Sequence, residues 1–210
     1  MNIENVSRLR GSEDIWLNAA FEMLRENGVE AVKVMPLAKK LGLTRTSFYW
    51  HFTDRDALLE AMIQGWERKN TGNLVKQTKG FAETINEAMF NVFDCWLDEN
   101  LFDARLDLAI RNWARNNNAL QERLDLADAK RGQALFEMFK KFDYDDAEAK
   151  ARSMTVIYTQ IGYISMDVRE NLEGRVSRMP DYIAVFTGKM PSPSEFERFK
   201  VRHRAILDRG

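Results

Sequence analysis

The sequence predicts an all-α protein, and three observations support this fold class. Apolar residues recur every three or four positions along almost all of the 210 residues, which is the period of a helix rather than of a strand. Only four prolines interrupt this pattern. Hydrophobic residues make up 45% of the chain, enough to form the core of a globular protein. We expect a three-helix N-terminal head followed by a larger helical domain.

The first helix is expected to run from Ser12 to Asn27. The Ser12 hydroxyl can cap its free N–H groups, and Glu13 and Asp14 are favoured at the positive end of the helix dipole. Gly28 can adopt the backbone conformation that ends a helix. Apolar residues at helical spacing indicate the buried face of this helix: Trp16, Ala20, Met23 and Leu24.

Two short helices are predicted next, near Pro36 to Leu41 and from about Thr44 to His51, joined by a tight turn at Gly42. Isolated helices shorter than about 12 residues are marginally stable in water, so both must pack against the first helix. Their inward-facing residues are Leu37, Ala38 and Leu41 in one helix, and Leu43, Phe48 and Phe52 in the other.

A longer helix is expected to begin at Thr53 or Asp54 and to continue to about Val75, with Asp54 as its N-cap. Its apolar residues lie on more than one side, so it can contact both the head and the following domain. Further helices are expected over residues 80–99, 102–115, 118–142, 145–171 and 194–208, with a loop at 188–194 before the last one.

Composition excludes several classes of site. Cys95 is the only cysteine and there are only two histidines, so neither a disulfide framework nor a structural zinc cluster can form within the chain. We interpret Cys95 as a buried, inert thiol. No signal peptide and no apolar run of about 18 residues is present, so we expect a cytoplasmic protein without membrane contact. No metal or cofactor is expected.

The second short helix carries an outward face suited to nucleic acid. Arg45 and Tyr49, and likewise Thr46 and Trp50, are four residues apart and therefore share a face. Arginine is the side chain that most often contacts guanine edges, and threonine methyl groups can meet thymine methyl groups. Tyrosine hydroxyls and His51 can bind phosphate. Because the net charge is only −1, this argument depends on the motif and not on bulk charge.

The head resembles the TetR family of repressors. The family pattern is an Ala, a Leu-Gly-apolar turn, a Ser or Thr, and then aromatic-Tyr-any-His-Phe. This chain has Ala38, Leu41-Gly42-Leu43, Thr44 and Phe48-Tyr49-Trp50-His51-Phe52. The resemblance extends from about Ser12 to Gly65. It departs from the family pattern before the first short helix, where Lys33 stands in place of a capping Ser or Thr and can itself contact phosphate.

The resemblance implies a dimer that binds double-stranded operator DNA and is released by a small-molecule effector. Arg55 occupies a position where the family commonly contacts phosphate. The expected DNA-binding residues are Lys33, Thr44, Arg45, Thr46, Tyr49, Trp50, His51 and Arg55. We expect residues 1–53 to bind DNA, and residues 54–210 to bind the effector and form the dimer, with 54–75 as the linking helix.

Aromatic and Met side chains concentrate in the C-terminal domain, which suits an apolar or aromatic effector. The expected pocket residues are Met89, Phe93, Trp96, Arg111, Trp113 and Tyr158. Asp107 and Arg111 belong to a charged ridge. Such a ridge is usually a solvated face, but a part of it that turned inward would select a charged or polar effector. The expected dimer interface is a four-helix bundle formed by Ile157, Ile161, Ile164, Val168, Phe196, Phe199 and Ile206.

Two other functions were weighed against an effector-controlled repressor. An enzyme is disfavoured because the chain has no phosphate-binding glycine loop, no HExxH motif and no GxSxG nucleophile motif. A DNA-binding regulator without an effector remains open, and would be recognised by a DNA affinity that no small molecule changes. The residues do not distinguish a repressor from an activator.

Overall fold

A computed structural model of the chain describes residues 12–208 and confirms the all-α fold, since no strand occurs in this range. The first eleven residues of the expected DNA-binding segment 1–53 lie outside the described part. The described residues form two compact units. The first unit comprises the described part of Met1–Arg68 together with Arg105–Gln121, and the second comprises Lys69–Ala104 with the described part of Glu122–Gly210.

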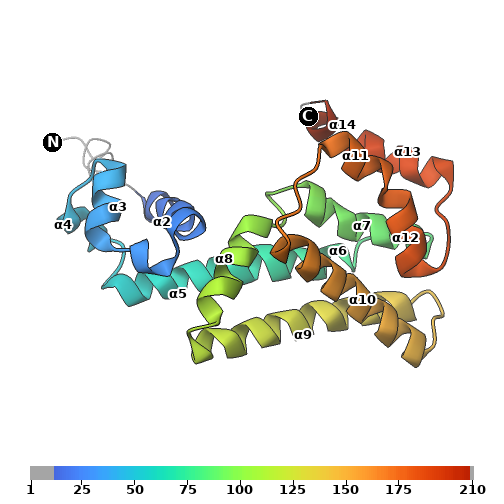
Figure 1. Cartoon of the computed structure of the whole chain (residues 1–210), viewed down its shortest axis with the longest axis horizontal. Helices are drawn as coiled ribbons and strands as arrows, with labels where there is room; N and C mark the ends of the chain where they lie inside the picture. The colour runs from blue at the N-terminus through green and yellow to red at the C-terminus, as the bar shows by residue number, and fades with distance from the viewer. Residues whose placement is uncertain (1–11, 209–210) are drawn as a thin grey trace. The chain divides into compact units, whose positions relative to one another are not determined.

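The first unit begins with the elements predicted for the head (Figure 1): α2 (Glu13–Asn27), η1 (Val29–Ala31), α3 (Val34–Leu41), α4 (Arg45–Phe48) and α5 (Arg55–Trp66). Ser12 caps α2 by accepting a hydrogen bond from the Ile15 N–H at 3.3 Å, as predicted. Asp54 caps α5 in the same way, at 2.8 Å from the Ala57 N–H. α4 ends earlier than the helix predicted to reach His51.

The core of the first unit forms around Trp16 of α2 and Phe48 of α4, both fully buried. Their rings meet edge to face with 5.3 Å between centroids, and Phe52 lies 5.4 Å from Phe48. Gly42 makes the turn between α3 and α4 possible, because its φ of 65° is in the left-handed region that residues with a side chain rarely adopt. Aromatic packing therefore fixes α4 on α2.

The first unit also contains α8 (Ala104–Ala114), where part of the charged ridge is turned inward, one of the two alternatives that the sequence left open. Asp107 is fully buried, and its carboxylate accepts hydrogen bonds from Trp66 Nε1 and from Arg111 Nε, each at 2.8 Å. A buried carboxylate requires such partners, because its desolvation is otherwise unfavourable. This part of the ridge is therefore an internal polar network.

The helix predicted at 54–75 is observed as three consecutive elements: α5, the π-helical segment η2 (Glu67–Gly72) and α6 (Asn73–Gln77). Polar residues anchor the part of this run that belongs to the second unit. The Asn70 side chain exchanges two hydrogen bonds of 3.0 Å with the backbone of Asp103, and Asn73 donates to the Leu101 carbonyl. Thr71 accepts from Arg131, whose side chain is only 3% exposed.

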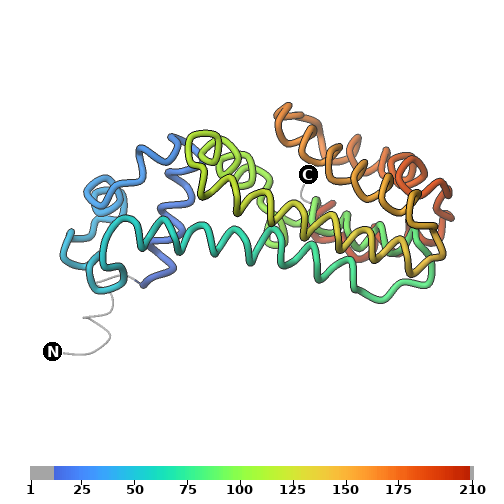
Figure 2. Tube along the Cα trace, turned by 90° about the horizontal axis from the view of Figure 1, so that it is seen from below, coloured from blue at the N-terminus to red at the C-terminus, as the bar shows by residue number. Residues whose placement is uncertain are grey.

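The second unit continues with α7 (Ile85–Leu97), α10 (Asp146–Ser165), α11 (Leu172–Ser177), α12 (Met179–Thr187), α13 (Pro193–Arg202) and α14 (Arg204–Leu207). The helix α9 (Asn118–Lys140) begins in the first unit and runs into the second. In the views of Figures 1 and 2, α9 and α10 lie side by side.

Helices α11 and α12 were not predicted, and α10 ends at Ser165 instead of continuing to residue 171. The chain leaves α10 through Asp167, whose φ of 47° is incompatible with continuing the helix. Asn171 then caps α11, and Pro180 occupies the first turn of α12. Val176, Met179, Ile183 and Phe186 are buried at helical spacing, so these two short helices are held by packing.

Three further observations concern the described residues only. No helix in this range is both long and apolar enough to cross a membrane. Within residues 12–208, no group of three or more His, Cys, Asp or Glu side chains is placed to hold a metal ion. Burial, together with the nearby Asp94 carboxylate, raises the pKa of the Cys95 thiol to about 12, so this group is protonated and inert near neutral pH.

Candidate DNA-binding face and ligand pocket

Six of the eight residues predicted to bind DNA are exposed in the first unit, and Thr44 among them is described below. Arg45, Thr46, Tyr49 and Trp50 are exposed on and directly after α4, with Tyr49 at 46% and Trp50 at 60% of their full exposure. Lys33 is exposed at the start of α3 and makes no side-chain cap. The buried Phe48 side chain anchors α4 in the core and so positions the exposed residues on and after this helix.

Arg45 and Tyr49 contact each other, which confirms that they share a face. Arg45 donates to the Tyr49 hydroxyl from Nε at 3.3 Å and from Nη2 at 3.0 Å, and its guanidinium lies 5.5 Å from the ring centroid. A guanidinium has five N–H donors, so this contact leaves others to bind an acceptor on a base or phosphate. The phenol thus orients Arg45 on the exposed surface.

Thr44 has a local structural role. Its hydroxyl caps α4 by accepting from the Ser47 N–H at 3.2 Å, and the Ser47 hydroxyl in turn donates to the Thr44 carbonyl at 2.7 Å. The residue itself remains exposed. Thr44 therefore fixes the start of α4, and its predicted contact with DNA stays a prediction.

His51 and Arg55 are turned away from the exposed face, which changes the interpretation of both. The Nε2 atom of His51 is buried without a hydrogen-bond partner among the described residues. Arg55 donates from Nε to the Val32 carbonyl at 2.6 Å and from Nη2 to the Val29 carbonyl at 2.8 Å. Arg55 thus binds the backbone carbonyls of Val29 in η1 and of Val32, the residue that follows η1, a role that its sequence position did not reveal.

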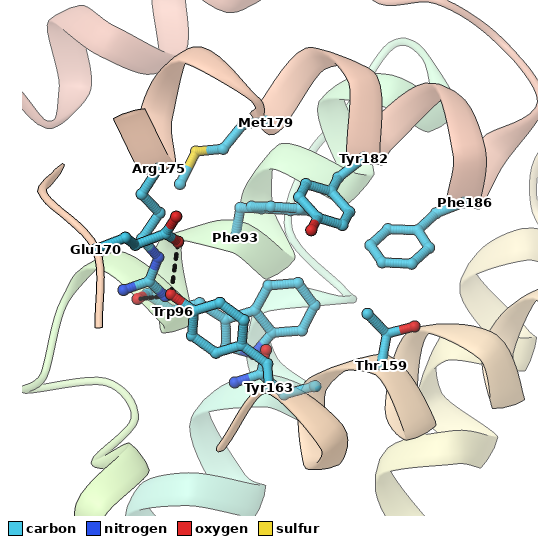
Figure 3. A pocket seen from close by; sticks show the side chains of 10 residues that line it. Phe93, Trp96, Thr159, Tyr163, Glu170, Arg175, Met179, Tyr182 and Phe186 are labelled. Atoms are coloured by element: carbon cyan, nitrogen blue, oxygen red, sulfur yellow. Dashed lines mark hydrogen bonds between the residues drawn. The ribbon is translucent and has the colours of Figure 1, made fainter. Parts of the chain in front are cut away.

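The second unit contains a cavity of about 60 Å³ bounded by α7, α10, α11 and α12. One side of it is aromatic and apolar (Figure 3). Phe93 and Trp96 meet with 4.7 Å between ring centroids, and Phe186 lies 6.3 Å from Phe93 and 6.1 Å from Tyr182. Met179 completes this wall. Such a lining suits an apolar or aromatic molecule.

The opposite end of the cavity is polar. Tyr163 donates from its hydroxyl to the Glu170 carboxylate at 2.6 Å, and Glu170 also forms an ion pair with Arg178. Arg175 donates to the Trp96 carbonyl at 2.7 Å, and its guanidinium lies 5.3 Å from the Tyr163 ring centroid. Figure 3 shows Glu170, Arg175 and Tyr163 grouped at this end. The indole Nε1 of Trp96 is buried without a hydrogen-bond partner in the described structure.

Only Phe93 and Trp96 of the six predicted pocket residues line this cavity. Met89 is fully buried in the core, whereas Tyr158 is 63% exposed on α10. Arg111 and Trp113 belong to α8 in the first unit, where Arg111 is bound to Asp107. Of the eight other lining residues, four lie on the unpredicted helices α11 and α12, namely Arg175, Met179, Tyr182 and Phe186. The other four lie within the helix predicted over residues 145–171, namely Thr159, Gln160, Tyr163 and Glu170.

The predicted dimer interface needs a similar correction. Ile157, Ile164 and Phe199 are 5%, 6% and 1% exposed, because they pack inside their own protomer and cannot meet a partner. Phe196 stacks on Phe90 of α7 with 6.0 Å between centroids. Phe196, Ile161 and Ile206 are partly exposed and Val168 is 39% exposed, so these four remain accessible. The large apolar side chains that α10 and α12 leave exposed are instead Tyr158, Tyr182 and Val185.

Comparison with known proteins identifies the first unit. Residues 17–62, from α2 into α5, match the family model described as bacterial regulatory proteins, tetR family. Within this range the chain is similar to that family. The class A tetracycline repressor from transposon 1721 of Escherichia coli is 35% identical over 54 residues, which cover 26% of this chain and 25% of that repressor. The class D tetracycline repressor of Escherichia coli is 39% identical over 46 residues.

The chain thus matches about a quarter of the length of these curated TetR-family relatives. Solved structures extend the similarity of fold to most of the chain. The fatty acid degradation regulator FadR from Bacillus halodurans has a TM-score of 0.62 at 15% identity, covering 85% of this chain and 95% of its own. The ketosteroid regulator KstR2 of Mycobacterium tuberculosis has a TM-score of 0.63 at 14% identity, covering 86% and 95%.

Proposed function

We propose that this chain is a cytoplasmic, dimeric transcriptional repressor that binds an inverted-repeat operator and releases it when a small molecule occupies the cavity of the second unit. The observation that carries the proposal is the exposed pair Arg45 and Tyr49 on a helix that Phe48 anchors in a TetR-family head. In this proposal residues 1–53 bind DNA, and residues 54–210 bind the effector and the second subunit. The helical run 54–75 links these two parts of the chain.

The cavity between α7 and α12 favours a regulator controlled by an effector and not one that binds DNA constitutively. A fully packed helical domain would need no pocket with one aromatic wall and one polar end. The pocket residues come from four helices, so a ligand that fills the cavity favours one arrangement of those helices. Only a ligand with different affinities for the two states of the protein can change its DNA affinity.

Arg45→Ala is expected to weaken operator binding by about 1 to 3 kcal/mol and to relax base preference at one position of each half-site. The reason is that Arg45 has free donors on an exposed helical face. A binding-site selection with wild type and variant measures both effects. Lys33→Ala is the matched control, because loss of a phosphate contact should weaken binding evenly across sequences and reduce its salt dependence. Equal base preferences for wild type and Arg45→Ala would contradict the assignment.

We further propose that the exposed face of α10 and α12 forms the dimer interface. Tyr158 and Val185 are 63% and 67% exposed, and neither has a role in the protomer core. Paired heads are needed because a single helix-turn-helix contacts only one half-site. An isologous contact places the same apolar side chains of two copies against each other, which removes them from water.

The double variant Tyr158→Asp with Val185→Asp is expected to convert the dimer into a monomer, since it would place like charges across a two-fold interface. Sedimentation velocity at micromolar concentration measures the change. Val201→Asp on α13 is the control, because Val201 is 70% exposed but lies outside the proposed interface. A wild-type monomer, or a double variant that stays dimeric, would show that another surface is used.

A further inference from the structure

Arg175 is a cation at the cavity that no carboxylate neutralises. Its guanidinium binds the Trp96 carbonyl and lies over the Tyr163 ring, and no ion pair of the described residues includes it. The nearest acidic residue of the lining, Glu170, is already bound to Arg178 and to the Tyr163 hydroxyl. Glu170 pairs with Arg178 and not with Arg175, so the polar end of the cavity carries one excess positive charge.

A second donor at the same cavity is also unsatisfied. Trp96 lines the pocket, and its Nε1–H is buried without an acceptor among the described residues. Buried polar groups are almost always hydrogen-bonded, so an orphan donor in a ligand cavity indicates where a ligand acceptor belongs. Arg175 donates to the backbone carbonyl of the same tryptophan, and both side chains line the cavity.

We propose that the cavity binds a small aromatic carboxylate. Its ring packs among Phe93, Tyr182 and Phe186, and its carboxylate accepts hydrogen bonds from Arg175 and from Trp96 Nε1. The carboxylate supplies the one negative charge that the polar end lacks, and charge-assisted hydrogen bonds to a guanidinium are stronger than neutral ones. The inference rests on the proposed function, because it names the class of effector that the cavity would take.

The size of the cavity limits the ligand to a single ring. An engineered protein cavity that binds benzene measures about 150 Å³. The present cavity is about 60 Å³, so even one ring requires its walls to move apart. Tyr182 belongs to the aromatic wall and lies on α12, so a ring that enters the cavity must displace it. Occupancy therefore changes the packing of α12, as an effector must.

Isothermal titration of the full chain with benzoate tests the proposal, with benzyl alcohol as the uncharged ring and cyclohexanecarboxylate as the non-aromatic acid. We expect benzoate to bind about 10-fold more tightly than either, because only benzoate matches both the charge and the aromatic wall. Equal affinity for benzoate and benzyl alcohol, or no binding of benzoate, would overturn the proposal. If cyclohexanecarboxylate bound more tightly than benzoate, the proposed aromatic ligand would be wrong and the cavity would instead bind an aliphatic acid.

Variants locate the binding site. Arg175→Gln should lower benzoate affinity about 10-fold and leave benzyl alcohol affinity unchanged. Trp96→Phe keeps an aromatic side chain but removes the indole N–H, so it should lower the affinity for both ligands. The control is Arg169→Gln, because Arg169 is 87% exposed beside the pocket but pairs with Asp167 at the surface. If Arg175→Gln does not fold, Arg175→Lys keeps the charge and should keep the preference for benzoate. If Arg175→Gln bound benzoate as tightly as the wild type, the proposed binding site would be wrong.

Operator binding, measured with the same proteins without ligand, separates this inference from the proposed function. If the operator is bound and another class of compound releases it, only the aromatic carboxylate is wrong. If no DNA is bound but benzoate binds with the expected Arg175 dependence, the proposed function is wrong and the ligand site stands.

Discussion

Phe48→Ala is expected to destabilise the first unit by about 3 to 5 kcal/mol and to abolish operator binding. Phe48 is fully buried and contacts the rings of Trp16, Tyr49 and Phe52, so its removal leaves a cavity bordered by three aromatic side chains. The four-residue helix α4 has no other large buried side chain to hold it. Urea denaturation followed by circular dichroism measures the loss, and a DNA titration measures its consequence.

Phe81→Ala provides the matched control for this prediction. Phe81 is 87% exposed and makes none of the ring contacts recorded for Phe48, so the same chemical change there should alter stability by less than about 0.5 kcal/mol. Operator binding should also be retained. A loss of comparable size in both variants would mean that Phe48 does not anchor α4 as its burial indicates.

Asp107→Ala is expected to cost about 3 to 5 kcal/mol of stability, because it leaves the Arg111 guanidinium and the Trp66 N–H without their carboxylate partner in a buried site. Arg111 has a side chain only 12% exposed, so water cannot readily replace the lost interaction. Asp107→Asn keeps an acceptor for Trp66 and should cost less. Thermal and urea denaturation of the wild type, Asp107→Asn and Asp107→Ala measure whether stability decreases in that order.

The pair Arg204 and Asp208 makes a sharp control, because it has the same four-residue spacing on a helix but is 80% and 70% exposed with 3.8 Å between the charged groups. Asp208→Ala should change the free energy of unfolding by no more than about 0.5 kcal/mol, as is usual for a solvated ion pair. If Asp107→Ala changed the free energy of unfolding by equally little, the buried hydrogen bonds of Asp107 would contribute little to stability.

Local signals account for what the sequence predicted correctly. The caps Ser12 and Asp54 and the turn glycine Gly42 act within a few residues of themselves, so their effect can be recognised without knowing the rest of the fold. The outward face of α4 followed from spacing in the same way. These signals suffice for the head and for the all-α class.

Residues whose roles depend on distant partners were not predictable in this way. Asp107 and Tyr158 both lie on amphipathic helices, but which face is covered depends on helices far away in the sequence, and the structure buries the first and exposes the second. Arg55 binds carbonyls of residues more than twenty positions earlier. The pocket was incomplete because α11 and α12 are short and were not recognised, although the helical spacing of Val176, Met179, Ile183 and Phe186 was a signal that could have revealed them.

The two hydrogen bonds of Arg55 have a mechanical consequence. They tie the first residue of α5 to the η1 turn that precedes α3, so α5 cannot shift at its start without carrying the turn, and with it α3 and α4. The proposed DNA-binding face is therefore expected to move as one rigid piece and to keep its shape. An isolated half-site should therefore bind with the same affinity in the presence and absence of effector, and regulation should be visible only when two half-sites at fixed spacing must be engaged at once.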